Sequence, residues 1–404
     1  MRKLFLFIVC FILFGVGIKA QRFPQAVLPG DYLDPSILRD GKNYYMTHSP
    51  FYYAPGFLIW HSTDLIHWEP VCRALPEYEG SAMAPDLLKY QGRYYIYYPT
   101  STGENFVIYA DNIRGPWSKP VKLDVKGIDP GHVVGEDGKR YLFTNNGWIT
   151  PLSDDGLKVT GKSRKVYDGW EYPANWVTEG KDMYLESPKL LYKDGYYYMM
   201  SAEGGTAGPA TSHMCVVARS KSVFGPWENS TYNPIVHTYS ASENWWSKRH
   251  GTLIDDVNGN WWVVYHAYAN GYHTLGRSTL IEPIEWTSDG WCRTTQDAVW
   301  LSENRQPEWK MELSDDFSKP ELGLQWTFWK EYEPKVLTFT EGEMQVKAKG
   351  RTPADGRLLL VTAMDKCYET EVEVRLGNGN IGGLLLYYNE EAYAGVSSNG
   401  KNFT

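Results

Sequence analysis

Between residues 34 and 262 the chain repeats one pattern of apolar and polar positions five times. Each copy has an apolar segment, a turn containing Gly, and a second segment that ends in Tyr or Trp. This order predicts a β-hairpin. The copies begin at Asp34, Ala84, Asp129, Glu186 and His250. Their starts lie roughly 45 to 65 residues apart, which is typical of propeller blades of four strands each.

A second pattern, in which a polar turn leads to Trp, follows nearly every hairpin. It occupies residues 61–68, 109–117, 218–227 and 276–286, with a degenerate form at 152–156. We interpret it as the third strand, a turn and the outer strand of each blade. No window has a sustained helical period, so the chain is predicted to be all-β. A large sandwich is the alternative, but two linked repeats favour a five-bladed β-propeller over residues 21–305.

From Met311 onward the pattern changes to short alternating strands without the blade repeats. These strands predict a β-sandwich-like domain over residues 311–404, joined to the propeller by the polar stretch 302–308. Such a domain would be small, and we expect it to be incomplete.

The charge composition excludes some classes of binding partner, and the N-terminal residues predict the cellular location. The net charge of -8 and the pI near 5.7 provide no basic surface for nucleic acid and no polybasic membrane patch. Arg2 and Lys3, followed by the apolar residues 4–18, predict a signal peptide over residues 1–20 and a secreted or periplasmic protein. An uncleaved anchor is the alternative, although no later apolar run is long enough for stable membrane insertion.

Cysteine spacing argues against a zinc site. The predicted mature chain has four cysteines without Cys-x-x-Cys spacing: Cys72, Cys215, Cys292 and Cys367. Disulfides and buried thiols both stay open for these residues.

Three of the five repeats open with an acid, at Asp34, Asp129 and Glu186. In a radial arrangement, equivalent positions converge on one axis, where like charges raise one pKa and leave an acid beside a base. Glycoside hydrolysis needs this pair. Asp-Pro is also a common turn opener, so Asp34 and Asp129 alone could be capping residues. The equivalent Ala84 indicates that the fold itself requires no carboxylate there.

Four segments around these positions, at 28–37, 127–131, 185–190 and 275–277, resemble glycoside hydrolase family 43. Members are five-bladed propellers and include β-xylosidases and α-L-arabinofuranosidases. The resemblance implies that Asp34 is the general base, that Asp129 orients the acid and tunes its pKa, and that Glu186 is the general acid of an inverting mechanism.

The resemblance also implies roles for His250, as the channel histidine beside a bound calcium or water, and for Arg277, as a substrate contact. A satisfied buried histidine and an ion-pair partner of the acids are the respective alternatives. Phe51 and Trp246 are candidates for stacking on a sugar ring, against a simple core role. No cofactor is expected to be required, and a structural calcium near His250 stays open.

The sequence therefore predicts a secreted glycosidase that releases terminal xylose or arabinose from plant oligosaccharides or polysaccharides. The alternative is a non-catalytic propeller that binds carbohydrate or protein. Loop geometry distinguishes the two sugars, so the sequence does not decide between them.

Overall fold

The computed structural model describes residues 24–176, 183–205, 209–296, 306–340 and 342–403. The predicted signal peptide lies outside these ranges. Strands dominate, and the helical segments within these ranges are three short 3-10 turns: η1 (Asn145–Gly147), η2 (His273–Leu275) and η4 (Pro334–Val336). None of the described helices is long and apolar enough to cross a bilayer.

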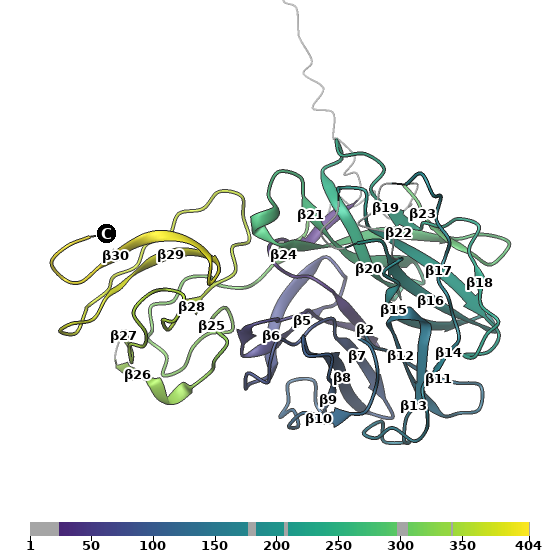
Figure 1. The fold of residues 1–404 in the computed structure, drawn as a ribbon, viewed down its shortest axis with the longest axis horizontal. Helices are drawn as coiled ribbons and strands as arrows, with labels where there is room; N and C mark the ends of the chain where they lie inside the picture. Colours follow the sequence, from purple (N-terminus) through teal and green to yellow (C-terminus); the bar gives the residue numbers. More distant parts are fainter. Residues whose placement is uncertain (1–23, 177–182, 206–208, 297–305, 341, 404) are drawn as a thin grey trace, which may run out of the picture.

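Five antiparallel sheets make up the larger part of the molecule (Figure 1). The first contains β2 (Ser36–Asp40), β3 (Asn43–Thr47), β5 (Gly56–Ser62) and β6 (His67–Leu75), and the second contains β7 (Asp86–Tyr90), β8 (Arg93–Pro99), β9 (Asn105–Ala110) and β10 (Val121–Leu123). The third contains β11 (Gly131–Val134), β12 (Arg140–Thr144), β13 (Trp148–Pro151) and β14 (Arg164–Lys165). The fourth contains β15 (Glu186–Lys193), β16 (Tyr196–Glu203), β17 (Met214–Ser220) and β18 (Glu228–Asn229), with β19 (Val236–His237) also paired to β17. The fifth contains β20 (Trp245–Asp255), β21 (Trp261–Ala269), β22 (Arg277–Trp286) and β1 (Gln25–Leu28), with β23 (Cys292–Thr294) also paired to β22.

The first strands of the five sheets form a closed ring. β2 contacts β7, β7 contacts β11, β11 contacts β15, β15 contacts β20, and β20 returns to β2. The fifth blade is built from both ends of this region, because β1 pairs with β22. The all-β prediction is confirmed, and the five sheets and these contacts agree with the predicted five-bladed propeller.

Five apolar cores lie between successive blades, and they contain many of the aromatic side chains. The core between the fifth and first blades contains Trp60 and Trp68, which are 0% and 1% exposed. The other four cores repeat this arrangement around the ring. Burial of a large apolar side chain stabilises the fold by about 1.5 to 3 kcal/mol, so these aromatics hold the blades together.

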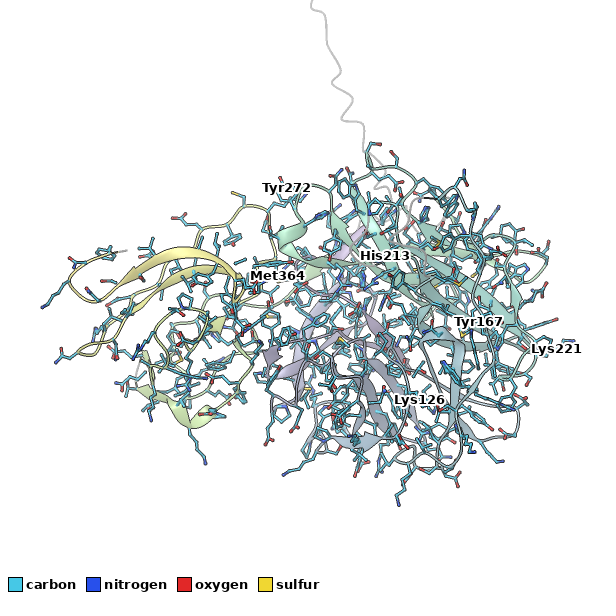
Figure 2. The ribbon with its side chains drawn as sticks, viewed as in Figure 1. Lys126, Tyr167, His213, Lys221, Tyr272 and Met364 are labelled. Carbon is cyan, nitrogen blue, oxygen red and sulfur yellow. The ribbon has the colours of Figure 1, made fainter. Side chains whose placement is uncertain are left out.

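The remaining described strands extend from one side of the first blade (Figure 1). β24 (Glu308–Trp309) pairs in parallel with β6, and β25 (Thr327–Trp329) pairs with β4 (Tyr53–Ala54) and β28 (Leu359–Leu360). Two separate hairpins follow, β26 (Leu337–Thr340) with β27 (Glu343–Val346), and β29 (Gly382–Asn389) with β30 (Ala392–Ser398). Met364, labelled in Figure 2, accepts a hydrogen bond from the Tyr32 hydroxyl at 3.7 Å. The two-layer sandwich and the domain boundaries stay predictions.

The four cysteines of the described chain are free thiols, two of them buried. They therefore make no covalent link between blades.

Candidate active site

The predicted acids lie at the starts of inner strands, where the backbone turns toward the axis. Asp34, Asp129 and His250 have φ angles of 52°, 56° and 54°, a left-handed conformation that non-glycine residues rarely adopt. In the fourth blade the positive φ falls one residue after the acid, at Ser187, with 52°. Strain of this kind is typical of functional sites.

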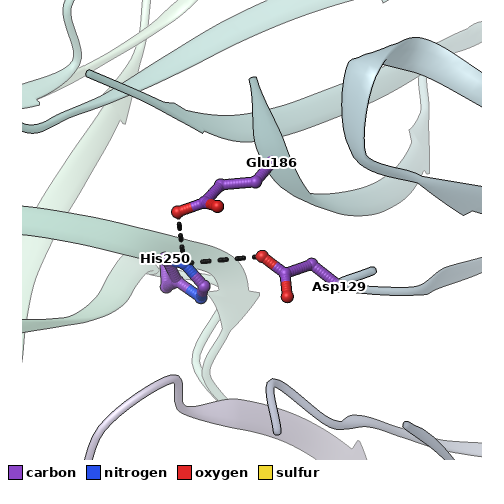
Figure 3. A group of neighbouring side chains, drawn as sticks. All are labelled: Asp129, Glu186 and His250. Carbon is purple, nitrogen blue, oxygen red and sulfur yellow. Dashed lines mark hydrogen bonds and ion pairs between the residues drawn. The ribbon is translucent and has the colours of Figure 1, made fainter. Parts of the chain in front are cut away.

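His250 lies at the centre of the cluster. Its Nδ1 is 3.2 Å from Asp34 Oδ1, and its Nε2 is 3.2 Å from Glu186 Oε1 and 3.7 Å from Asp129 Oδ2. Figure 3 shows Asp129 and Glu186 converging on this ring. Asp34 and Asp129 are buried, whereas the Glu186 side chain is 15% exposed. The structure thus brings together all three acids and the histidine that the sequence indicated.

Asp34 is held as a carboxylate. Burial favours its neutral form, but His250, Arg277 and Arg249 outweigh burial and keep the pKa of Asp34 well below its usual range. The Ser49 hydroxyl donates to Oδ2 at 2.6 Å, and Arg277 Nη1 lies 3.4 Å from Oδ1. An ionised carboxylate in this position can accept a proton from water.

Asp129 and Glu186 form a coupled pair, with carboxylate oxygens within 4.8 Å of each other. Burial and the negative charges of Glu186 and Asp34 raise the pKa of Asp129 well above its usual value. Burial acts in the same direction on Glu186, but Arg249 and His250 lower the pKa of that residue. In the free protein, the proton of the pair therefore favours Asp129.

Arg249 is a site residue that the repeat analysis missed. Its Nη1 lies 2.6 Å from Glu186 Oε1, and its Nε lies 3.1 Å from His266 Nε2. Neighbours on a regular strand point to opposite faces, yet Arg249 and His250 both reach the cluster. The register of β20 shifts on each side of Arg249, and such bulges redirect side chains.

His266 and Ser49 were also missed, because neither opens a repeat. The backbone N–H of Asp34 donates to His266 Nδ1 at 2.7 Å, and Ser49 lies fifteen positions after Asp34. The position of Ser49 before Pro50, at the end of the first hairpin, carried no clear signal in the sequence.

Arg277 forms an ion pair with Asp34, and its guanidinium lies 6.0 Å from the Tyr268 ring centroid. Phe51 and Trp246 are both half-buried and belong to none of the five described cores. Trp246 Nε1 donates to the carbonyls of Ala241 and Glu243 at 3.1 Å each. Sugar stacking by Phe51 and Trp246 stays a prediction.

This cluster offers few ligands for a calcium ion. Asp129, Glu186 and His250 offer two carboxylates and one imidazole. Calcium takes about six to eight oxygen ligands, and Glu186 is already paired with the Arg249 cation. The donor set does not suit calcium, so no chemical step is assigned to a metal.

Comparison with known proteins agrees with this geometry. The sequence model described as Glycosyl hydrolases family 43 matches residues 23–292. The chain belongs to glycoside hydrolase family 43. This membership makes it a glycosidase, and the non-catalytic alternative is not retained.

Relatives of this family 43 chain carry names for pentose-releasing enzymes. It is 30% identical to the non-reducing end alpha-L-arabinofuranosidase of Bacteroides ovatus over 86% of this chain and 69% of the relative. It is 34% identical to a xylosidase/arabinosidase of Butyrivibrio fibrisolvens over 66% of this chain and 55% of the relative. A solved xylan beta-1,4-xylosidase of Bacillus halodurans is 27% identical, with a TM-score of 0.79 over 93% of this chain and 79% of that one.

Proposed function

We propose that this protein hydrolyses terminal β-D-xylosyl or α-L-arabinofuranosyl residues of plant oligosaccharides or polysaccharides by an inverting mechanism. Asp34 takes a proton from water as the water oxygen bonds to the anomeric carbon. Glu186 gives a proton to the glycosidic oxygen as the bond to the leaving group breaks. Asp129 controls the protonation and the orientation of the Glu186 carboxyl group.

The arrangement around His250 carries the proposal. Asp34 and Glu186 contact different nitrogens of that ring, each at 3.2 Å, so part of an imidazole ring separates them. Inverting glycosidases hold their two carboxyl groups about 6.5 to 9.5 Å apart to admit water, compared with about 5 to 5.5 Å in retaining enzymes. The two carboxyl groups are therefore held apart by the imidazole ring and one contact on each side of it. This arrangement supports the wider spacing of the inverting enzymes.

The surroundings of the two acids support the same assignment of Asp34 as the base and Glu186 as the acid. Asp34 is kept ionised by three basic side chains, which suits a base. Glu186 is the most exposed of the three acids, which suits a group that reaches the leaving oxygen. Its proton comes from the pair with Asp129, because Arg249 favours the carboxylate of Glu186 in the free protein.

The substrate class rests on the relatives, whose names include xylosidase, arabinosidase and arabinofuranosidase. We extend this class to the present chain and assign its action to xylan-derived chains. Export to the periplasm or the medium belongs to the same proposal, because polysaccharide substrates are extracellular. It rests on the signal-like residues 1–20.

A panel of aryl glycosides tests the proposal. Wild-type protein is expected to cleave an aryl β-xyloside or an aryl α-arabinofuranoside, and the preferred sugar identifies the activity. Glu186→Gln is expected to lose about 10² to 10⁴-fold in kcat with a poor leaving group and far less with a good one. Asp34→Asn is expected to lose activity with both. Absence of wild-type activity on every pentoside would refute the proposed function.

A further inference from the structure

A second layer of side chains lies beside the catalytic acids, one step further along the inner strands. The residue after each entrance proline is Ser36, Asp86, Gly131 or Lys189 in the first four blades. Ser36 Oγ accepts the Leu87 N–H at 2.8 Å, and Asp86 Oδ2 accepts the His132 N–H at 2.7 Å. This layer therefore links the first blade to the second and the second to the third.

Lys189 is the buried cation of this layer, at 9% exposure. Its Nζ donates to the Pro85 carbonyl at 2.8 Å, to Asp86 Oδ1 at 2.9 Å and to the Pro130 carbonyl at 3.1 Å. An ammonium group has three N–H donors, so all three are used. One side chain of the fourth blade thus binds the entrances of the second and third blades.

One of these contacts bears directly on the catalytic pair. Pro130 follows Asp129 in the chain, and its carbonyl is one of the acceptors of Lys189. Lys189 lies on the same strand as Glu186, and the register of β15 shifts between those two residues. Lys189 therefore connects the backbone of Asp129 to the strand that carries Glu186.

The third and fourth blades also pack closely at this level. A Cβ placed on Gly131 would lie 1.7 Å from the Pro188 carbonyl oxygen, so the third and fourth blades touch through their backbones at this level. The Lys189 ammonium adds a polar bridge between these two blades beside the acids.

We propose that Lys189 is a positioning residue that fixes Asp129 relative to Glu186. This inference rests on the proposed function. Because Asp129 acts on the reaction through the acid, displacement of its backbone affects protonation of the leaving group first. Substitution of Lys189 therefore lowers kcat on substrates whose leaving group needs that proton.

Lys189→Met tests this role, with Lys248→Met as the matched control. Lys248 is also a buried lysine, at 7% exposure, and its Nζ contacts Glu243 Oε2 at 3.0 Å and the His237 carbonyl at 3.2 Å. Each variant is assayed on a pentoside with a good leaving group, such as dinitrophenol, and on one with an alkyl leaving group. Thermal unfolding is measured in parallel.

Lys189→Met is expected to lose about 10 to 100-fold in kcat on the alkyl pentoside, because a shift of about 1 Å in a catalytic group costs on this scale. Its KM should stay within about threefold, and its activity on the dinitrophenyl pentoside should be largely retained. Lys248→Met should lose stability without this dependence on the leaving group. Equal losses on both substrates, a change confined to KM, or the same profile in Lys248→Met would overturn the inference.

Asp86→Asn provides a second route if Lys189→Met does not fold. It removes the negative partner of Lys189 and keeps the size of the side chain, so the same selective loss, in weaker form, is expected. A uniform profile in Asp86→Asn would also count against the inference. Wild-type activity separates the two failures, because an inactive wild type refutes the proposed function itself.

Discussion

Glu203 on β16 is a fully buried acid whose charge should destabilise the fold. It is 0% exposed, its Oε1 accepts the Trp170 N–H at 2.6 Å, and its Oε2 has no hydrogen-bond partner among the described residues. Burial raises the pKa of Glu203 from 4.5 to about 8. Glu203→Gln keeps the size of this side chain and removes its titration.

The expected effect follows from proton binding in the two states. Between pH 4.5 and about pH 8 the unfolded chain has released this proton while the folded protein keeps it. The unfolded state then binds fewer protons, so the contribution of Glu203 to stability falls as pH rises, by about 1.4 kcal/mol per pH unit. At pH 7 the titration of Glu203 should make the free energy of unfolding of the wild-type protein about 3 kcal/mol lower than at acidic pH.

Urea unfolding at a series of pH values measures this effect. The free energy of unfolding of Glu203→Gln minus that of wild type should grow by about 1.4 kcal/mol per unit between pH 5 and pH 7.5. Glu228→Gln is the control, because the Glu228 side chain is 61% exposed. A Glu203→Gln difference that stays constant or shrinks over this range would refute the reasoning.

Three further predictions concern the active site. Arg249→Met removes the cationic partner of the largely buried Glu186 carboxylate, so unfolding experiments should show a loss of stability of about 3 to 5 kcal/mol at neutral pH. Asp129→Asn removes the group on which the proton of the pair resides and leaves Glu186, whose pKa Arg249 and His250 lower, so the alkaline limb of the kcat/KM profile should move to lower pH; an upward shift would contradict this. Treatment with EDTA should leave activity unchanged, because Arg249 and Arg277 already balance the acids; a loss restored by calcium would show that a metal takes part.

The propeller was predictable because its information is local and repeated. Each hairpin carries its own turn, and the radial arrangement then places Asp34, Asp129 and Glu186 together. The closing strand β1 was not predictable in this way. It has four residues, and its partner β22 lies about 250 positions away, so no local pattern joins them.

The partners of the acids were harder to find than the acids. Arg249 reaches Glu186 only because register shifts interrupt the alternation of β20, and alternation is what sequence reasoning assumes. Lys189 was visible in the sequence after Ser187 and Pro188, but its three acceptors belong to other blades. Contacts between repeats depend on the closed ring, which no single repeat specifies.

The stereochemistry of the first-formed sugar tests the central claim most directly. Proton NMR during rapid hydrolysis of the preferred aryl pentoside records the anomer released before mutarotation. Water activated by Asp34 on the face opposite Glu186 predicts a product of inverted configuration. A product of retained configuration would contradict the account, because it would require a covalent intermediate in place of direct attack by water.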